Sequence, residues 1–217
     1  MEFQRARRPD QVEQRRRAIL DVAGAMLRER RVAEVSLREL SHRVGLAKSN
    51  VLRYFDSREA IFLELLDREW DAWLDELAEG LPATGAEGVA TAVATSLLAR
   101  SSLCELVSGM AGVLERNVGV DFARAFKRRA NARTARLADL VRARVPVLDE
   151  AAARHFAGAV LVMTAGLWPH ANPTPAVAQA VRDLGGPPAD ELVRSGLVEG
   201  LVNQLAGLVA RAGGARP

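Results

Sequence analysis

Residues 35–55 carry the pattern of two short helices joined by a glycine turn, and this pattern constrains the fold of the chain more than any other feature. Ser36 and Glu39 stand at capping-box spacing, in which a hydroxyl and a carboxylate each satisfy a backbone N–H at the start of a helix. We therefore expect a helix to begin near Leu37. Gly45 stands where the chain must reverse, a place that favours the positive φ open to glycine.

The second helix of the pattern begins within two residues of the turn and has a polar and an apolar side. Val51, Leu52 and Phe55 are expected to anchor it to the first helix. Amide, hydroxyl and cationic groups on the polar side, laid in the major groove of DNA, can reach bases and phosphates. The pattern therefore predicts a helix-turn-helix motif, with candidate DNA contacts at Ser36, Arg38, Lys48, Ser49, Asn50, Arg53, Tyr54 and Arg58.

Residues 48–59 read Lys-Ser-Asn-Val-Leu-Arg-Tyr-Phe-Asp-Ser-Arg-Glu. This string resembles the TetR family of bacterial one-component transcriptional regulators, which begin this stretch with lysine and small polar residues and end it with aromatic-Phe-x-Ser/Thr-Lys/Arg-Glu. The similarity runs from about residue 11 to residue 65. Two positions depart from the family pattern: Ala47 stands where a capping serine is common, and Leu52 stands where a phosphate-bonding tyrosine is common. These departures bear on the detailed contacts with DNA and leave the motif intact.

Positive charge is concentrated in the first quarter of the chain. Residues 1–55 hold 13 Arg and Lys against 7 Asp and Glu, a net +6, whereas residues 56–217 hold 17 against 20, a net −3. Because neutralising phosphates releases condensed counterions, such a chain should bind DNA with one end and in a salt-dependent way. The expected electrostatic contributors are Arg5, Arg7, Arg8, Arg15, Arg16 and Arg17, of which the first three could equally form a solvated arm in the absence of DNA.

The rest of the chain reads as helices, because the alternation typical of strands hardly occurs and aromatic residues make up only 5% of the sequence. Apolar residues recur at helical spacing. Helix starts are expected at Asp56 or Ser57, at Ser102 with Glu105 as a capping box, and at Asp149. The expected helices cover about 11–30, 57–79, 89–100, 102–115, 121–145, 149–168, 176–182 and 190–211.

The expected fold class is all-α, with a three-helix DNA-binding domain over residues 1–56 and a larger helical effector-binding and dimerisation domain over residues 57–217. The last two long helices carry more apolar surface than one domain edge needs, and their small residues allow close helix approach. The resemblance to the TetR family implies that they pair with those of a second subunit as a four-helix bundle. A two-fold homodimer would place two recognition helices about 34–36 Å apart, on one face of a roughly palindromic double-stranded DNA operator.

The resemblance also implies a ligand cavity inside the C-terminal domain. Occupation of such a cavity by a small-molecule effector shifts the long helix that follows the motif, and by linkage the ligand and the DNA then weaken each other's binding. Apolar side chains could line this cavity or could simply be core. Repression is favoured over activation, and an apolar or aromatic effector over a cationic one, but the sequence settles neither question. The candidate lining residues are Trp70, Trp73, Leu106, Met110, Phe122, Phe126, Met163 and Trp168.

Other classes of function find little support in the sequence. No nucleophile elbow, phosphate-binding loop or zinc-protease motif occurs, so no catalytic role is expected. His155 and His170 lack partners at metal-ligand spacing, so neither a metal nor a cofactor is expected. The polar N-terminus, the absence of an apolar stretch approaching the roughly 18 residues that span a bilayer, and the single Cys104 predict a cytoplasmic protein without a membrane partner.

The alternative is a helical interaction or scaffold protein whose basic N-terminal arm binds acidic partners or a membrane surface. That reading gives no reason for residues 48–55 to follow Gly45 at turn-helix spacing. DNA sequence selectivity separates the two readings, because a scaffold would show no preference among duplexes.

Overall fold

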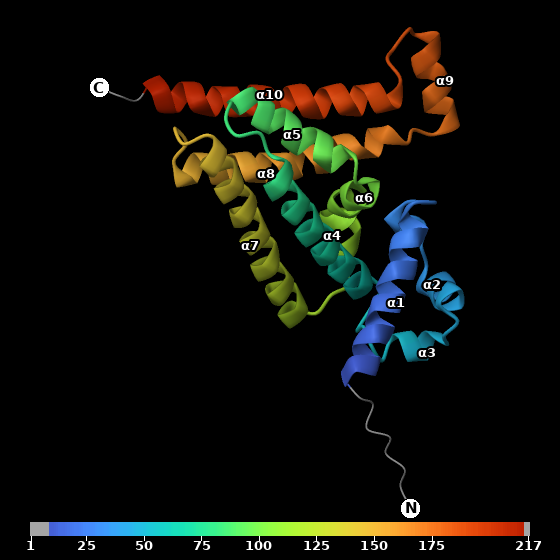
Figure 1. The fold of residues 1–217 in the computed structure, drawn as a ribbon. Coiled ribbons are helices and arrows are strands. Elements are labelled where there is room, and N and C mark those ends of the chain that lie inside the picture. The colour runs from blue at the N-terminus through green and yellow to red at the C-terminus, as the bar shows by residue number, and fades with distance from the viewer. Residues whose placement is uncertain (1–8, 215–217) are drawn as a thin grey trace, which may run out of the picture.

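The computed structural model of the protein describes residues 9–214, and these form helices and no strand. The all-α fold expected from the sequence is therefore confirmed. The predicted arm residues Arg5, Arg7 and Arg8 lie outside the described residues. Figure 1 shows a small bundle at one end of the molecule, joined through one long helix to a larger body of helices.

The small bundle holds α1 (Pro9–Leu27), α2 (Leu37–Val44) and α3 (Lys48–Val51). A short 3-10 turn, η1 (Val32–Glu34), connects α1 to α2. The first helix ends three residues earlier than the sequence pattern predicts. The apolar faces of the three helices meet in a common core, which includes the buried side chains Ile19, Met26, Leu40, Val51 and Phe55.

The long helix α4 (Arg58–Gly80) connects the bundle to the body. It packs against α1 on one side and against α5, α6 and α7 on the other. Its apolar residues recur every three or four positions and are at most 2% exposed, as the periodicity predicts: Phe62, Leu66, Trp70, Trp73 and Leu77.

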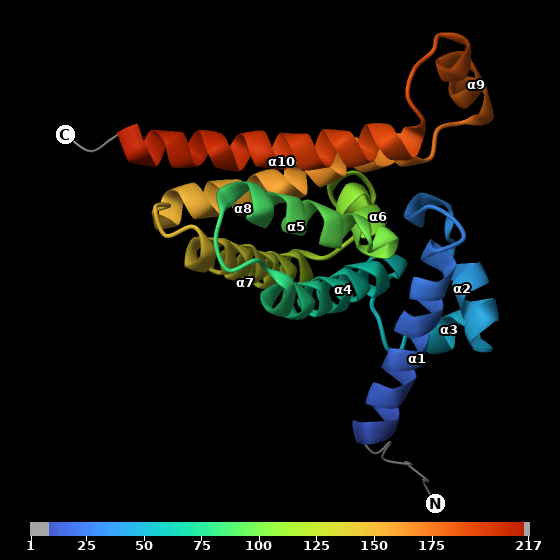
Figure 2. The ribbon, with the colours of Figure 1, turned by 45° about the horizontal axis from the view of Figure 1, so that its top comes forward.

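The body is completed by the helices after α4. In both views α8 and α10 lie side by side as long rods at the edge of the body away from α2 and α3 (Figures 1 and 2), and α9 projects from the connection between them. The elements are α5 (Ala86–Leu98), α6 (Ser101–Gly109), the π-helical turn η2 (Met110–Leu114), α7 (Val120–Arg144), α8 (Glu150–Leu167), the 3-10 turn η3 (Trp168–Ala171), α9 (Pro175–Asp183) and α10 (Ala189–Gly214).

Three of the predicted helix caps are confirmed. Ser36 Oγ accepts the Glu39 N–H at 3.2 Å, and Ser57 Oγ, rather than Asp56, accepts the Ala60 N–H at 3.0 Å. Asp149 Oδ1 accepts the Ala152 N–H at 2.7 Å. Each of these side chains satisfies a backbone N–H that the helix itself leaves unpaired.

The capping box predicted at Ser102 and Glu105 is wrong. The helix α6 already begins at Ser101, and its N-cap is Arg100, which makes no side-chain capping bond. The Glu105 carboxylate instead bonds to Val32 and Trp168, two distant parts of the chain.

Within residues 9–214, no single helix is long and apolar enough to cross a membrane. One pair of helices bent by 89°, Ala86–Leu98 with Ser101–Leu114, passes the same test of length and composition only when the two are taken together.

Candidate nucleic-acid interface and its link to the helical body

The turn between α2 and α3 has the geometry that the sequence predicts. Gly45 adopts the left-handed conformation with φ 72°, and its N–H donates to His42 O at 3.1 Å. The Leu46 N–H donates to Ser41 O at 3.0 Å, and within α2 the buried Ser41 donates its hydroxyl to Leu37 O at 2.6 Å. The bonds of Gly45 and Leu46 close the C-terminal end of α2 before α3 begins.

The polar side of α3 is exposed, as the motif requires. Lys48, Ser49, Asn50 and Arg53 all lie at the surface, close together along one short helix and the turn after it. Ala47 occupies the N-cap position without a capping bond. The predicted contacts Ser36 and Arg38 are exposed at the start of α2, where the Ser36 hydroxyl also serves as the helix cap.

The expected anchors of α3 divide into two kinds. Val51 and Phe55 are buried against α1 and α2, as predicted. The expectation for Leu52 is wrong, because this side chain is 39% exposed. Leu52 follows the last residue of α3, and it lies on the side of the helix that faces solvent.

Arg16 lies inward rather than on the basic surface assigned to it. Its guanidinium donates to Tyr54 O and to the Glu64 carboxylate, and it lies 4.3 Å from the centre of the Phe55 ring. The residue therefore ties α1 to the end of the recognition segment and to α4. The partly buried Tyr54 lines a mainly polar groove of about 520 Å³ with Gln11, Gln14, Arg15 and Ala18.

Arg58, predicted as a DNA contact, is also turned inward. Its guanidinium donates to the backbone carbonyls of Val35 and Val32, pairs with Glu59 at 3.1 Å and lies 5.0 Å from the centre of the Phe62 ring. The Arg58 side chain is 15% exposed. We correct its role to that of a clamp that holds η1 against the start of α4.

Glu105 makes a connection that sequence reasoning missed. Its two carboxylate oxygens accept the Val32 N–H at 2.8 Å and the Trp168 indole N–H at 3.1 Å. Val32 also packs on Gly109, where an added Cβ would lie 2.5 Å from the valine side chain. One carboxylate on α6 thus connects the small bundle with the end of α8.

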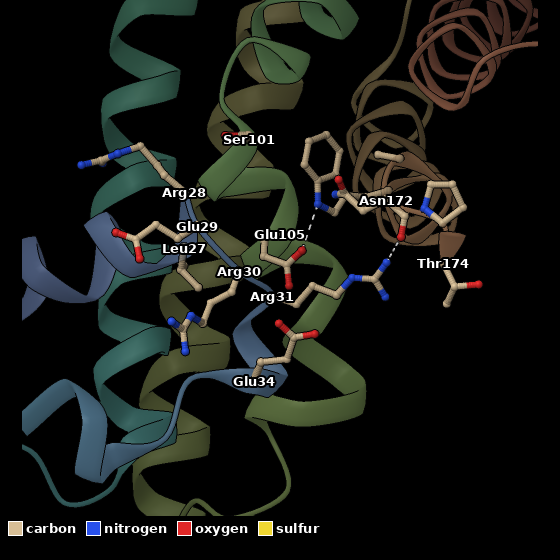
Figure 3. A pocket seen from close by; sticks show the side chains of 13 residues that line it. Leu27, Arg28, Glu29, Arg30, Arg31, Glu34, Ser101, Glu105, Asn172 and Thr174 are labelled. Atoms are coloured by element: carbon tan, nitrogen blue, oxygen red, sulfur yellow. Dashed lines mark hydrogen bonds between the residues drawn. The ribbon is translucent and has the colours of Figure 1, made fainter. Parts of the chain in front are cut away.

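A cavity of about 550 Å³ opens beside this connection, between the small bundle and the body (Figure 3). Arg31 reaches across it and donates to Asn172 O. Other lining residues include Arg28, Glu34, Glu105 and Trp168. Arginine and glutamate side chains both line this cavity, so it favours neither a positively nor a negatively charged ligand.

The eight candidate effector residues are spread over the described part of the body rather than gathered around one cavity. The cavities of about 550, 520, 440 and 390 Å³ are each lined by at most one of them. Trp168 lines the largest and Phe122 the smallest. Met163 packs over Gly200 of α10, and Met110 lies partly buried in η2. The other four, buried in the body, are Trp70, Trp73, Leu106 and Phe126.

A ladder of ion pairs joins α4 to α7. Asp67 accepts from Arg129 at 2.7 Å and from Arg133 at 2.6 Å, and Arg133 also binds Asp71 with two bonds of 2.6 and 2.7 Å. One turn farther along, Arg136 pairs with Asp75 at 2.6 Å. The residue numbers rise together, so the two helices run parallel. Asp67 is 8% exposed, and burial raises the pKa of its carboxyl although both arginines oppose this shift.

The histidines of the body and the cysteine lie apart from one another. His155 and His170 are exposed, and no group of three His, Cys, Asp or Glu residues in the described part of the chain could hold a metal ion. Cys104 is fully buried, as the sequence predicts, and donates to Leu97 O at 3.3 Å. Burial raises the pKa of its thiol to about 12.

Known proteins resemble the chain in both of its parts. The family described as bacterial regulatory proteins, tetR family, matches residues 19–65, and the family described as tetracyclin repressor-like, C-terminal domain, matches residues 67–212. The HTH-type transcriptional regulator EthR of Mycolicibacterium smegmatis is 33% identical over 72 residues. That match covers 32% of this chain and about a third (33%) of the relative's length.

Solved structures share the fold. A tetR-family transcriptional regulator from Streptomyces coelicolor superposes with a TM-score of 0.56 at 18% identity, covering 94% of this chain and 90% of that one. The transcriptional regulator FadR from Bacillus subtilis, solved in complex with stearoyl-CoA, gives a TM-score of 0.54 at 15% identity, covering 86% and 97%. The exposed polar side of α3, its glycine turn and the two family matches lead to one conclusion: the chain belongs to the TetR family of transcriptional regulators, DNA-binding proteins that are not enzymes.

Proposed function

We propose that the protein is a ligand-responsive repressor of the cytoplasm that binds a roughly palindromic operator as a homodimer and leaves it when a small molecule binds. The observation that carries this proposal is the exposed polar side of α3, held by a buried core on a bundle that is itself bonded to the body at Val32. The B. subtilis FadR of similar fold was solved with stearoyl-CoA, which supports a small-molecule ligand in a body of this shape.

The contacts to DNA are assigned to exposed side chains. Asn50 and Arg53 offer the amide and guanidinium groups that read base edges, and Lys48 and Ser49 suit phosphate oxygens. Arg38 and Ser36 lie at the start of α2, and the first helix of this motif crosses the sugar-phosphate backbone of the DNA. Tyr54 is assigned to the edge of the same surface, whereas Arg58 supports it from within.

The dimer interface is assigned to α8 and α10. Val162 is 73% exposed on α8 and Leu192 is 43% exposed at the start of α10, although both are large apolar side chains. Gly166 and Ala206 are exposed on the same two helices and permit close approach of a second copy. Val162→Glu is therefore expected to yield a monomer by analytical ultracentrifugation.

Release of DNA is assigned to the connection between bundle and body. The helix α4 belongs to both parts, and Glu105 bonds η1 to the end of α8. A ligand that favours one arrangement of α4 and α6 in the body therefore changes the placement of α3. Because coupling is reciprocal, the operator lowers the affinity for such a ligand by the same factor.

Selection of random duplex DNA by the purified protein tests this proposal. We expect enrichment of an inverted repeat by the wild type. Arg53→Ala should lose it, while Arg142→Ala, which removes an exposed arginine from the far end of α7, should retain it. Enrichment of no sequence by the wild type, or the same enrichment by Arg53→Ala, contradicts the proposal and favours the scaffold reading.

A further inference from the structure

Trp70 carries an indole N–H that is buried without an acceptor. The residue is 1% exposed, and its Nε1 has no hydrogen-bond partner among the described residues. Trp73, one turn later on the same helix, is equally buried, but its Nε1 donates to Ser96 Oγ at 3.0 Å. Because an unpaired buried donor is costly and native proteins avoid it, the Trp70 indole calls for an acceptor from outside the body.

No fully buried polar side chain of the body is bonded to this donor. The body's buried polar side chains in the described region are Asp67 and Thr164. Both Asp67 oxygens accept from arginines, one from Arg129 and one from Arg133. The Thr164 hydroxyl donates to Val160 O one turn earlier on its own helix. Trp70 Nε1 and Arg144 Nε are the two buried side-chain atoms of the described residues that have no partner, and both are donors, so a partner must supply an acceptor.

The segment η2, which packs against α4, is the part of the body that we expect to move when a ligand enters. The segment η2 is a single π-helical turn that follows α6 and packs against α4. Such turns are rare and occur frequently at functional sites. In η2 only Leu114 is fully buried, and Ala111 and Gly112 face solvent. Met110, Val113 and Leu114 hold the turn against the core, and its other two residues are exposed.

We propose that Trp70 is the polar contact of the effector site and that the effector is a neutral, mainly apolar molecule with a hydrogen-bond acceptor oxygen, such as a ketone, ester or amide. This inference rests on the proposed function, whose ligand it specifies. The oxygen accepts the Trp70 N–H while the apolar part displaces η2 from α4. A neutral ligand follows because charge in a core is costly without a partner, and Arg129, Arg133 and Asp67 are already paired with one another.

A matched pair of probes tests the chemistry of the site. Valerophenone and pentylbenzene have nearly the same shape, but only the first has a carbonyl oxygen. Both are titrated into ¹⁵N-labelled protein, and the indole N–H signals of the three tryptophans are followed by NMR. We expect valerophenone to shift the Trp70 signal and to bind about fivefold more tightly than pentylbenzene, the effect of one neutral hydrogen bond.

Two variants serve as the test and its control. In Trp70→Phe the aromatic ring stays and the donor is lost, so the two probes should bind equally. In Trp73→Phe the lost donor is one that Ser96 already satisfies, so the preference for valerophenone should persist. Equal affinities in the wild type, or a Trp70 signal that valerophenone leaves unmoved up to its solubility limit, overturns the proposal.

Operator binding measured on the same samples separates this inference from the proposed function. A wild type that selects an inverted repeat but shows no valerophenone response at Trp70 refutes the ligand assignment alone. A valerophenone response at Trp70 in a protein without any DNA preference leaves a ligand-binding protein and refutes the repressor. Both readouts use the full chain, and the wild-type shift does not depend on the folding of any variant.

Discussion

Glu105 on α6 accepts the backbone N–H of Val32 at 2.8 Å, although 73 residues separate the two in the chain. The carbonyl oxygen of Val32 in turn accepts a hydrogen bond from the Arg58 guanidinium. The two bonds place η1 between the body on one side and α4 on the other. The bundle that carries the recognition helix is therefore fixed to the body by the continuous helix α4, by this backbone contact and by the bond from Arg31 to Asn172 O.

Glu105→Gln is expected to loosen that contact. The carboxylate accepts two N–H donors, one on each oxygen, whereas a carboxamide has one acceptor oxygen and an NH₂ group that cannot accept. One buried donor is then unpaired, which should lower the free energy of unfolding by about 1–3 kcal/mol. Hydrogen exchange at the Val32 amide and at the Trp168 indole N–H reports the change, because one of the two loses its acceptor. Glu199→Gln, on an exposed part of α10, is the control, and unchanged protection of both groups in Glu105→Gln would contradict the assignment.

Arg58 and Arg53 should separate stability from DNA recognition. In Arg58→Ala two backbone carbonyls lose their charged donor, so we expect a loss of about 1–3 kcal/mol in the free energy of unfolding. Arg53 is exposed, and Arg53→Ala should change stability by less than about 0.5 kcal/mol while it weakens operator binding. Urea denaturation together with a DNA-binding assay measures both effects. Equal free energies of unfolding for the two variants would contradict the clamp and favour Arg58 as a DNA contact.

Ala47→Ser should stabilise the recognition helix. Ala47 has the extended backbone of an N-cap residue, with φ −64° and ψ 146°, but no side chain that can accept a backbone N–H. A serine at this position can accept a backbone N–H of α3, as Ser36 does at the start of α2. Such a cap stabilises the folded protein by about 0.5–2 kcal/mol. Ala143→Ser, in the last turn of α7, is the control and should lose a few tenths of a kcal/mol, about the difference in helix propensity. Thermal unfolding compares the two, and a Tm for Ala47→Ser at or below that of the wild type argues against the cap.

Asp67 should make stability fall as pH rises through its pKa. Burial raises the pKa of this carboxyl above its ordinary value of 3.8, so the folded state binds its proton more tightly than the unfolded state. The stabilisation that this proton contributes is complete below the pKa of Asp67 in the unfolded state. It is lost as pH rises through the pKa of Asp67 in the folded state. The difference in unfolding free energy between wild type and Asp67→Asn should therefore decrease from acidic pH upward. A difference that grows with pH would mean that Arg129 and Arg133 outweigh burial.

Local signals in the sequence predicted the elements of the fold well. Ser36, Ser57 and Asp149 cap the helices that they were expected to begin, and Gly45 adopts the predicted left-handed turn. Each of these signals depends on the residue and its next few neighbours along the backbone. The periodicity of α4 likewise identified its buried face, because one face of a long helix must meet the core.

Long-range partners decided the cases in which sequence reasoning failed. Ser102 and Glu105 have the same spacing as Ser36 and Glu39, but Glu105 bonds to Val32 and Trp168 instead. Arg58 lies within the string that resembles the family motif, and two carbonyl groups more than twenty residues away turn it inward. No pattern of neighbouring residues contains these partners. Helical spacing identified buried tryptophans for the same reason, but it could not show which of them lacks a hydrogen-bond acceptor.

The ladder between α4 and α7 has a consequence for how the molecule meets DNA. Without Asp67, Asp71 and Asp75, the arginines of α7 would present a second cationic strip on the flank of the body. A long polyanion would then be captured sideways as readily as end-on, and many encounters would be unproductive. With the strip neutralised, a net charge of +6 in residues 1–55 stands against −3 in the rest of the chain, so we expect long-range attraction to bring DNA to the small bundle first.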